Sequence, residues 1–361
     1  MNVNKLLEKY EKRQNEWYNL RPILGCANWA LFFILLGGRE AGKSYSVTNF
    51  FVDQFVNKGI PFVWLRLTET QTRKLLANNA ERLIDADIRR KYNLDLVTRG
   101  NNVYAVKREE VEVKHKDGST TTETRIKEKT LMARVYAIST FYTDKGSIYD
   151  KDFLNDPNMR YNIAVDEFER EKGEKNTFDI VYSLVNQLEN LLRSTKERTK
   201  IFFLGNTLED ASDILCAFNY IPETWGIFKL KSKRCVIHNI EPTDAYKRRR
   251  KGSIADILMP QASTFTNKID TDTTLITKKR LIEPQYIIKF TKNKADWFTV
   301  WDSNIIKPYT GEKKPVIAMR PYLDEVYEKD LVKNMITLFN TRSLLFTNLI
   351  TFKRFQHSIS L

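Results

Sequence analysis

The stretch that decides the fold of this chain is an eight-residue loop, Gly37-Gly38-Arg39-Glu40-Ala41-Gly42-Lys43-Ser44. It fits the pattern G-x-x-x-x-G-K-[ST], which binds the phosphates of a nucleotide. The apolar residues 31–36 before it have the length of a buried strand, and residues 45–55 after it carry apolar side chains at helical spacing. Because strand, loop and helix are the context that the pattern requires, we predict a P-loop rather than a glycine-rich turn that merely ends a strand.

In a P-loop, backbone N–H groups and the N-terminus of the following helix face the phosphates. We therefore expect all eight residues to line a nucleotide site. Lys43 is expected to reach the β- and γ-phosphates, and Ser44 is expected to hold Mg²⁺. Arg39 has two interpretations, as a phosphate contact or as a solvated loop residue.

Length and composition place the chain among globular proteins of two domains. It has 361 residues, 42% of them hydrophobic, and its apolar runs are all shorter than a membrane span. Cys26, Cys216 and Cys235 are widely spaced, which fits neither a disulfide framework nor a zinc site and indicates a reducing compartment. The net charge of +14 favours a polyanionic partner, nucleic acid before membrane, although a solubilising charge excess is the alternative.

The alternation of strands and helices predicts an α/β domain with a parallel sheet. We assign residues 1–242 to this domain, residues 243–272 to a basic linker, and residues 273–361 to a small basic α+β domain. In such sheets ligands bind beyond the carboxyl ends of the strands. The P-loop, Asp166-Glu167 and Asn206 all follow apolar strands, so we expect them to meet at one edge.

Each step of phosphoanhydride hydrolysis has a candidate residue. Asp166 would support Mg²⁺ and Glu167 would polarise the attacking water, unless this acidic pair only caps a helix. Asn206 would sense the γ-phosphate, or it is a turn residue. Arg193 would be an arginine finger that reaches the nucleotide of a neighbouring subunit, with Arg198 as the alternative, unless both only favour a helix dipole.

Two further patterns carry weaker expectations. Asn293-Lys294-Ala295-Asp296 matches the guanine-reading motif N-K-x-D, but it follows the P-loop by about 250 residues, so we interpret it as a hairpin turn. The charged segment 107–131 predicts a protruding hairpin around Asp117-Gly118. That hairpin, with Arg66, Arg73 and Lys74, offers weak candidates for DNA contacts, and for each a solvated face is the preferred interpretation.

Four segments together resemble the DNA-encapsidation ATPases of small terminal-protein-primed tailed phages, which are relatives of the terminase large subunit. These segments are FILLGGREAGKSYS, FVWLRL, YNIAVDEFEREK and RSTKERTKIFFLGN, and they occur in order over about residues 30–210. The resemblance implies an ASCE/RecA-like P-loop NTPase fold with helices on both faces of the sheet, followed by a vestigial RNase H-like nuclease. It implies that Asn206 lies in a coupling motif and that Arg193 is the trans-acting finger, with Lys196 or Arg198 as alternatives.

The same resemblance implies an ATP- and Mg²⁺-dependent motor that moves double-stranded DNA into a prohead. Its implied partners are the portal, a structural prohead RNA and further copies of itself in a homopentameric ring, with no membrane. The implied location is the host cytoplasm, transiently on the prohead, and not the mature virion. The C-terminal carboxylates form no convincing acidic centre, so we expect a domain that does not cleave; they are Asp296, Asp302, Asp324, Glu325, Glu328 and Asp330.

Two other functions fit the residues. The first is a helicase or loader, because a glutamate directly after the metal-binding aspartate suits those ATPases too. The second is a nucleotide-gated DNA-binding scaffold with negligible turnover, against which Glu167 argues.

Overall fold

The computed structural model describes residues 17–114, 120–140, 162–169, 179–192, 199–206, 212–261, 266–267, 274–290, 297–319 and 329–360. The chain forms two compact units. The first comprises Met1–Glu209 and Pro222–Ile269, and the second comprises Asp210–Ile221 and Asp270–Leu361. No helix within the described residues is long and apolar enough to cross a membrane.

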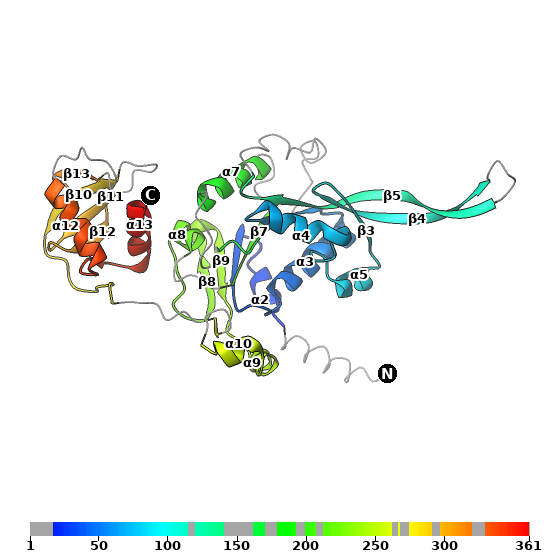
Figure 1. Ribbon diagram of the computed structural model, residues 1–361, viewed down its shortest axis with the longest axis horizontal. Coiled ribbons are helices and arrows are strands. Elements are labelled where there is room, and N and C mark those ends of the chain that lie inside the picture. The colour runs from blue at the N-terminus through cyan, green and yellow to red at the C-terminus, as the bar shows by residue number, and fades with distance from the viewer. Residues whose placement is uncertain are drawn as a thin grey trace. The chain divides into compact units, whose positions relative to one another are not determined.

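A nine-stranded sheet organises the first unit, in the order β3-β4-β5-β2-β6-β7-β1-β9-β8 (Figure 1). Its strands are β1 (Phe32–Leu36), β2 (Phe62–Arg66), β3 (Asp95–Arg99), β4 (Asn102–Lys114), β5 (Thr120–Ala137), β6 (Asn162–Asp166), β7 (Lys200–Gly205), β8 (Gly226–Leu230) and β9 (Cys235–Asn239). From β5 to β9 the neighbouring strands pair in parallel, and the antiparallel pairs lie at the two edges. The predicted α/β class is confirmed, and β7 is the additional strand between β1 and β6 that defines the ASCE order.

The helices of this unit are α2 (Arg21–Leu24), α3 (Lys43–Lys58), α4 (Glu69–Ala80), α5 (Ala86–Tyr92), α7 (Ile180–Leu192), α9 (Asp244–Arg250) and α10 (Ile254–Leu258), with a 3-10 turn at Lys231–Lys233. One face of the sheet packs against α2–α5 in a continuous apolar core. Phe51 of α3 lies in this core, where its ring contacts those of Phe62, Trp64 and Phe202. Because β1 is buried on both faces, its carboxyl end holds the P-loop in a fixed place.

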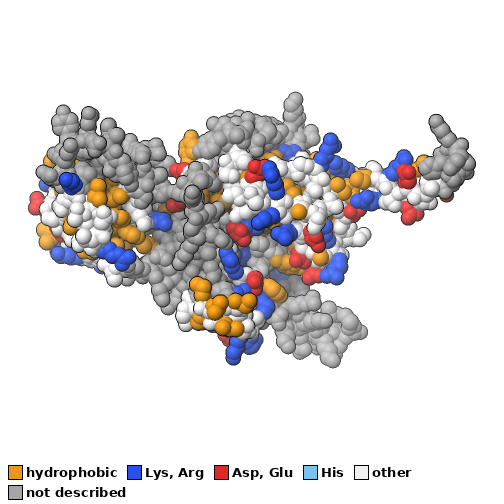
Figure 2. Space-filling view, in the orientation of Figure 1, with side chains coloured by type: hydrophobic (Ala, Val, Ile, Leu, Met, Phe, Trp, Pro, Cys, Tyr) orange, Lys and Arg blue, Asp and Glu red, His pale blue; other side chains and the backbone are white. Residues whose placement is uncertain are grey.

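A two-stranded ribbon of β4 and β5 projects from the sheet (Figure 1). The predicted tip, Asp117-Gly118, lies outside the described residues. Residues 107–129 contain seven Lys or Arg and six Asp or Glu, and cross-strand ion pairs such as Lys107–Glu128 and Lys127–Glu109 join the two signs (Figure 2). A ribbon so close to neutral offers little net attraction to phosphate, which argues against a role in gripping DNA.

The second unit contains a five-stranded sheet in the order β13-β10-β11-β12-β14. Its elements are α8 (Asp213–Ala217), β10 (Pro284–Phe290), β11 (Trp297–Trp301), β12 (Ile305–Pro308), β13 (Val316–Met319), α12 (Lys329–Asn340), β14 (Leu345–Phe346) and α13 (Leu349–Ser360). Phe355 of α13 packs with Phe290, Phe298 and Phe346 in the core of this sheet. The predicted small α+β domain is therefore present in the described residues.

The unit boundaries differ from the assigned domains in two places. Residues 210–221, assigned to the first domain, group with the second unit. The first unit extends to Ile269, so most of the segment 243–272 belongs to it, and α9 packs on the P-loop instead of spanning two domains. This packing is a contact between residues some 200 positions apart, which no local pattern indicates.

Candidate functional site

The P-loop follows β1 and ends where α3 begins at Lys43. Gly42 has a φ of 91°, a left-handed conformation that glycine adopts without a steric penalty. A Cβ at Gly37 would lie 3.1 Å from the Cδ1 atom of Ile240, so the loop also passes closely over the end of β9. The two glycines thus serve a turn and a close approach, as the P-loop pattern predicts.

The ammonium group of Lys43 donates three hydrogen bonds, two of them to carbonyls of the loop. Its Nζ donates to the carbonyls of Gly37 at 2.7 Å and Gly38 at 2.9 Å, and to Oδ1 of Asn206 at 3.2 Å. Burial lowers the pKa of Lys43 to about 8, although the carboxylates of Asp166, Glu169 and Glu167 oppose this shift. At neutral pH the amine is still mostly protonated, and a bound phosphate would favour the charged form further.

The next three carbonyls of the loop, those of residues 39–41, accept hydrogen bonds from outside it. The donors are Oη of Tyr246 at 2.9 Å, Nη2 of Arg249 at 2.8 Å and the backbone N–H of Tyr18 at 2.9 Å. Because the N–H and C=O of one trans peptide point in opposite directions, the amides of Glu40 and Gly42 face the other side of the loop, while the amide of Ala41 donates to the carbonyl of Gly38 at 3.4 Å. This is the arrangement that cradles an anion.

Asp166 is the last residue of β6 and is buried. Its Oδ1 atom accepts from the Oγ atom of Ser44 at 3.2 Å, and its Oδ2 atom lies 3.2 Å from Nη2 of Arg66. Burial raises the pKa of Asp166, while Arg66 and the hydrogen bond from Ser44 hold it down. A hydroxyl joined to a carboxylate is a donor set of hard oxygens, which is what Mg²⁺ takes from a protein beside phosphates.

Glu167 continues the chain past β6 in a left-handed conformation with φ 52°, and its N–H donates to the carbonyl of Leu204 at 2.9 Å. Its carboxylate forms an ion pair with Nη1 of Arg66, the last residue of β2. Arg66 therefore bridges both carboxylates of the acidic pair. The expectation of a DNA contact or a solvated face for Arg66 is wrong, because its side chain is only 13% exposed.

Asn206 follows β7 and contacts Lys43 as described, so the structure brings it to the P-loop. A Cβ at Gly205 would lie only 2.9 Å from Cζ of Phe168, which shows how tightly the segment after Glu167 packs against β7. Glu169, two residues beyond Glu167, is buried near Lys43. Sequence reasoning missed Glu169 as a site residue, and its place in the run Asp-Glu-Phe-Glu was the only signal.

The structure thus brings together the P-loop, Asp166, Glu167 and Asn206. Arg193, Lys196 and Arg198 lie outside the described residues, as does the N-K-x-D segment. Among the described residues, no group of three or more His, Cys, Asp or Glu side chains is arranged to hold a metal. A magnesium ion here would therefore take few protein ligands, namely Ser44 and Asp166.

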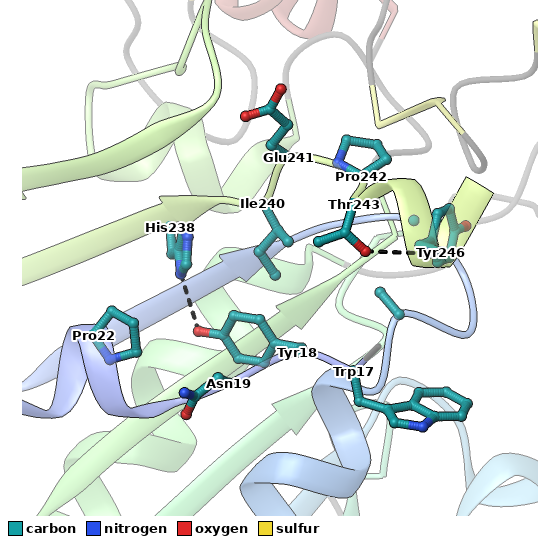
Figure 3. Close-up of a pocket in the computed structure, with 12 residues that line it drawn as sticks. Trp17, Tyr18, Asn19, Pro22, His238, Ile240, Glu241, Pro242, Thr243 and Tyr246 are labelled. Atoms are coloured by element: carbon teal, nitrogen blue, oxygen red, sulfur yellow. Dashed lines mark hydrogen bonds between the residues drawn. The ribbon is translucent and has the colours of Figure 1, made fainter. Parts of the chain in front are cut away.

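A cavity of about 270 Å³ opens beside the P-loop (Figure 3). Its walls come from the loop, from the segment before α2 and from the segment between β9 and α9; they are Trp17, Tyr18, Asn19, Pro22, Gly38, Ala41, His238, Ile240, Glu241, Pro242, Thr243 and Tyr246. The hydroxyl group of Tyr18 lies 3.1 Å from Nδ1 of His238. Burial lowers the pKa of His238 to about 4, so its imidazole is neutral at physiological pH. A largely apolar cavity next to a phosphate loop suits a nucleobase.

Comparison with known proteins gives matches to solved structures only. A scan of protein-family models and a search of curated proteins found no match. A chain of the bacteriophage phi29 viral genome packaging motor assembly aligns with a TM-score of 0.61 and 18% identity, covering 95% of this chain and 98% of that one. The phi28 gp11 DNA packaging motor aligns with a TM-score of 0.57 and 16% identity, covering 96% and 99%. Over nearly its whole length, this chain has the fold of phage DNA-packaging motor proteins.

Proposed function

We propose that this chain is an ATPase that drives double-stranded DNA into a phage prohead. The observation that carries the proposal is the group Lys43, Ser44, Asp166, Glu167 and Asn206 at the carboxyl ends of three adjacent strands. The nucleobase would occupy the cavity between Tyr18 and Tyr246, with the triphosphate on the loop. The fold shared with two phage packaging motors supports the choice of substrate.

In this proposal the phosphates displace Lys43 from the carbonyls of Gly37 and Gly38, and the lysine then binds phosphate oxygens. Ser44 and Asp166 would hold Mg²⁺, which would supply positive charge beside the phosphates. Glu167 would orient the attacking water through its carboxylate, of which one oxygen, Oε2, pairs with Arg66 in this structure. Asn206 would sense the γ-phosphate, and its hydrogen bond with Lys43 supports this part of the proposal.

The finer parts of the proposal come from the resemblance. Copies of the chain form a homopentameric ring on the portal, with a structural prohead RNA as a further partner. Arg193 of one copy, or Arg198, completes the site of the next. The second unit is a basic domain that does not cleave DNA, and the protein acts in the host cytoplasm and leaves before the virion matures. A net charge of +14 supports a grip on phosphates that weakens with salt.

The test is ATP turnover with and without double-stranded DNA, for the parent, Glu167→Gln, Arg193→Ala and Arg198→Ala, and for mixtures of the parent with each variant. Arg90→Ala is the control, because its side chain is 78% exposed and pairs with Asp87 of the same helix, α5. A ring motor predicts turnover stimulated by DNA, lost in Glu167→Gln and in one arginine variant, and suppressed beyond simple averaging in mixtures. Mixtures that merely average, with a fully active dilute monomer, would refute the shared site.

Two further assays, duplex unwinding and ATP binding, separate the two alternative functions from a packaging motor. A helicase or loader would unwind a forked duplex in the absence of any prohead. A nucleotide-gated scaffold would bind ATP tightly and show no turnover, even when assembled on its partner.

A further inference from the structure

Helix α9 is a short basic helix that packs directly on the P-loop. It begins after Thr243, whose hydroxyl oxygen accepts from the N–H of Tyr246 at 3.1 Å, and it ends in Arg248, Arg249 and Arg250. Tyr246 is buried, while Arg248 is exposed and points to no group of the loop. The helix therefore presents one face to the loop and another to solvent.

Three groups of α9 bind two successive residues of the loop. The Tyr246 hydroxyl donates to the carbonyl of Arg39 at 2.9 Å, and Nη2 of Arg249 donates to the carbonyl of Glu40 at 2.8 Å. Nη1 of Arg250 lies 2.5 Å from Oε2 of Glu40, and the Arg250 side chain is only 13% exposed. Backbone and side chain of Glu40 are thus both held by the same helix.

The backbone of Glu40 has an unfavourable conformation that contacts with α9 can hold in place. Its φ is 61°, in the left-handed region that side chains other than glycine rarely adopt. A residue stays in that region when its surroundings fix it. Because the carbonyl of Glu40 is held by Arg249, and the carbonyl of Arg39 by Tyr246, the amide of Glu40 faces the opposite side of the loop, where a phosphate would bind.

Trp17 forms a second contact between α9 and the loop. The guanidinium of Arg249 stacks on the ring of Trp17 at 3.7 Å, and Cε3 of Trp17 lies 3.0 Å from the position of a Cβ at Gly42. Trp17 is therefore wedged between Arg249 and the end of the loop. Together the arginine and the tryptophan restrain the loop at Glu40 and at Gly42.

We propose that Arg249 and Arg250 are positioning residues for the phosphates of the nucleotide, which act through Glu40. The inference rests on the proposed function in taking that nucleotide to be ATP. The two arginines fix the loop before the ligand arrives, and preorganisation of this kind improves binding more than the subsequent chemistry. The segment assigned from sequence to a linker is thus part of the nucleotide site.

The test compares Arg250→Met, Arg249→Met, Glu40→Gln, the double variant Arg250→Met/Glu40→Gln, and the control Arg248→Met, which removes the same charge from the same helix. For each we would measure the Kd of MgADP, the KM and kcat for ATP, and hydrogen exchange of the amides of residues 38–42 without nucleotide. We expect Arg250→Met to raise Kd and KM about tenfold and to leave kcat within about twofold. Glu40→Gln should match it, and the double variant should lose no more than either single one.

Equal behaviour of Arg250→Met and Arg248→Met would overturn the proposal, as would a double variant whose loss is the product of the two single losses. If Arg250→Met does not fold, Glu40→Gln tests the same contact with every arginine in place. Absence of ATP turnover in the parent would defeat the proposed function alone, since MgADP binding still reports on the loop. If the parent binds no nucleotide, unchanged hydrogen exchange in Arg250→Met would refute the positioning role.

Discussion

Replacing Arg66 by methionine tests the electrostatics of the site most directly. The substitution removes the cation that bridges Asp166 and Glu167 and keeps a side chain of similar length. The Asp166 side chain is only 6% exposed, so the loss leaves a buried carboxylate without its ion-pair partner. Removing one partner of a buried ion pair lowers the free energy of unfolding by about 3–5 kcal/mol. Loss of the ion pair with the half-exposed Glu167 adds little to this, because water screens it.

The loss of stability in Arg66→Met should increase with pH. Burial raises the pKa of Asp166 and Arg66 lowers it, so in Arg66→Met the pKa rises further. A carboxyl group whose pKa is raised in the folded state stabilises the fold below its unfolded pKa, and this stability is lost as pH rises through the folded value. The free energy of unfolding of the variant should therefore fall further below that of the parent at about pH 8 than at about pH 5. The difference grows by up to ~1.4 kcal/mol for each pH unit over which Asp166 is protonated only in the folded variant.

The assay is urea unfolding at these two pH values, followed by hydrogen exchange in peptides that cover β2 and β6, so that the first unit is measured by itself. Arg73→Met is the control, because Arg73 and Glu69 form an exposed pair within one helix at 2.6 Å. That pair should contribute no more than about 0.5 kcal/mol. A loss in Arg66→Met no greater than in the control, or equal at both pH values, would refute the reasoning.

Three further predictions concern other parts of the chain. ATP affinity should fall as pH rises from about 7 to about 9, because a lysine with a pKa of about 8 loses the charge that binds phosphate; a flat profile of Kd against pH would contradict the assigned role of Lys43. Gly205→Ala should cost about 1–3 kcal/mol in thermal unfolding, since its Cβ meets Phe168 at 2.9 Å, whereas Gly25→Ala, with nothing within 4 Å, should cost nothing; equal effects would refute the packing argument. In the second unit, burial alone would raise the pKa of Glu312, but hydrogen bonds from Thr310 and Thr299 hold it at about 2, below the ordinary 4.5. The ionised Glu312 therefore stabilises the fold above pH 4.5, and this contribution to the free energy of unfolding is lost as pH falls toward 2. In Glu312→Gln, the free energy of unfolding measured in acid should no longer show this loss.

The sequence predicts the parts of the site that are local patterns. The P-loop, the acidic pair after β6 and Asn206 after β7 each follow an apolar strand, and parallel strands bring their carboxyl ends to one edge. The strand order itself was not accessible in this way, because pairing of β1 with β7 and β9 joins segments about 170–200 residues apart.

The partners of residues that interact with distant parts of the chain could not be predicted from the sequence for the same reason. Arg66 looked like one more basic residue until β2 was placed beside β6, where it meets Asp166 and Glu167. The basic run in α9 looked like a solvated linker, because nothing local indicates that Glu40 is its partner. In both cases a charge whose partner is distant in sequence is indistinguishable from a surface charge.

The charge balance of the site bears on how it would work. The groups that act on Lys43 and Asp166 are the cation Arg66 and the carboxylates of Glu167 and Glu169, besides these two residues themselves. Two cations thus face three carboxylates, in a buried setting where screening by water is weak. In the proposed function, Mg²⁺ bound with the triphosphate would offset the excess of carboxylates around Lys43 and Asp166.

Release of Glu167 toward a water molecule would also free one arm of Arg66, but Asp166 still holds the other at 3.2 Å. Arg66 is therefore poorly placed to stabilise charge on the γ-phosphate during transfer. Among the described residues of one copy, the loop offers Lys43 and Arg39 for that task, and in the proposed ring an arginine finger of a neighbouring copy would add a further cation. If the proposed ring forms, we predict that assembly raises ATP turnover above that of an isolated copy, because the neighbouring arginine would stabilise charge on the γ-phosphate.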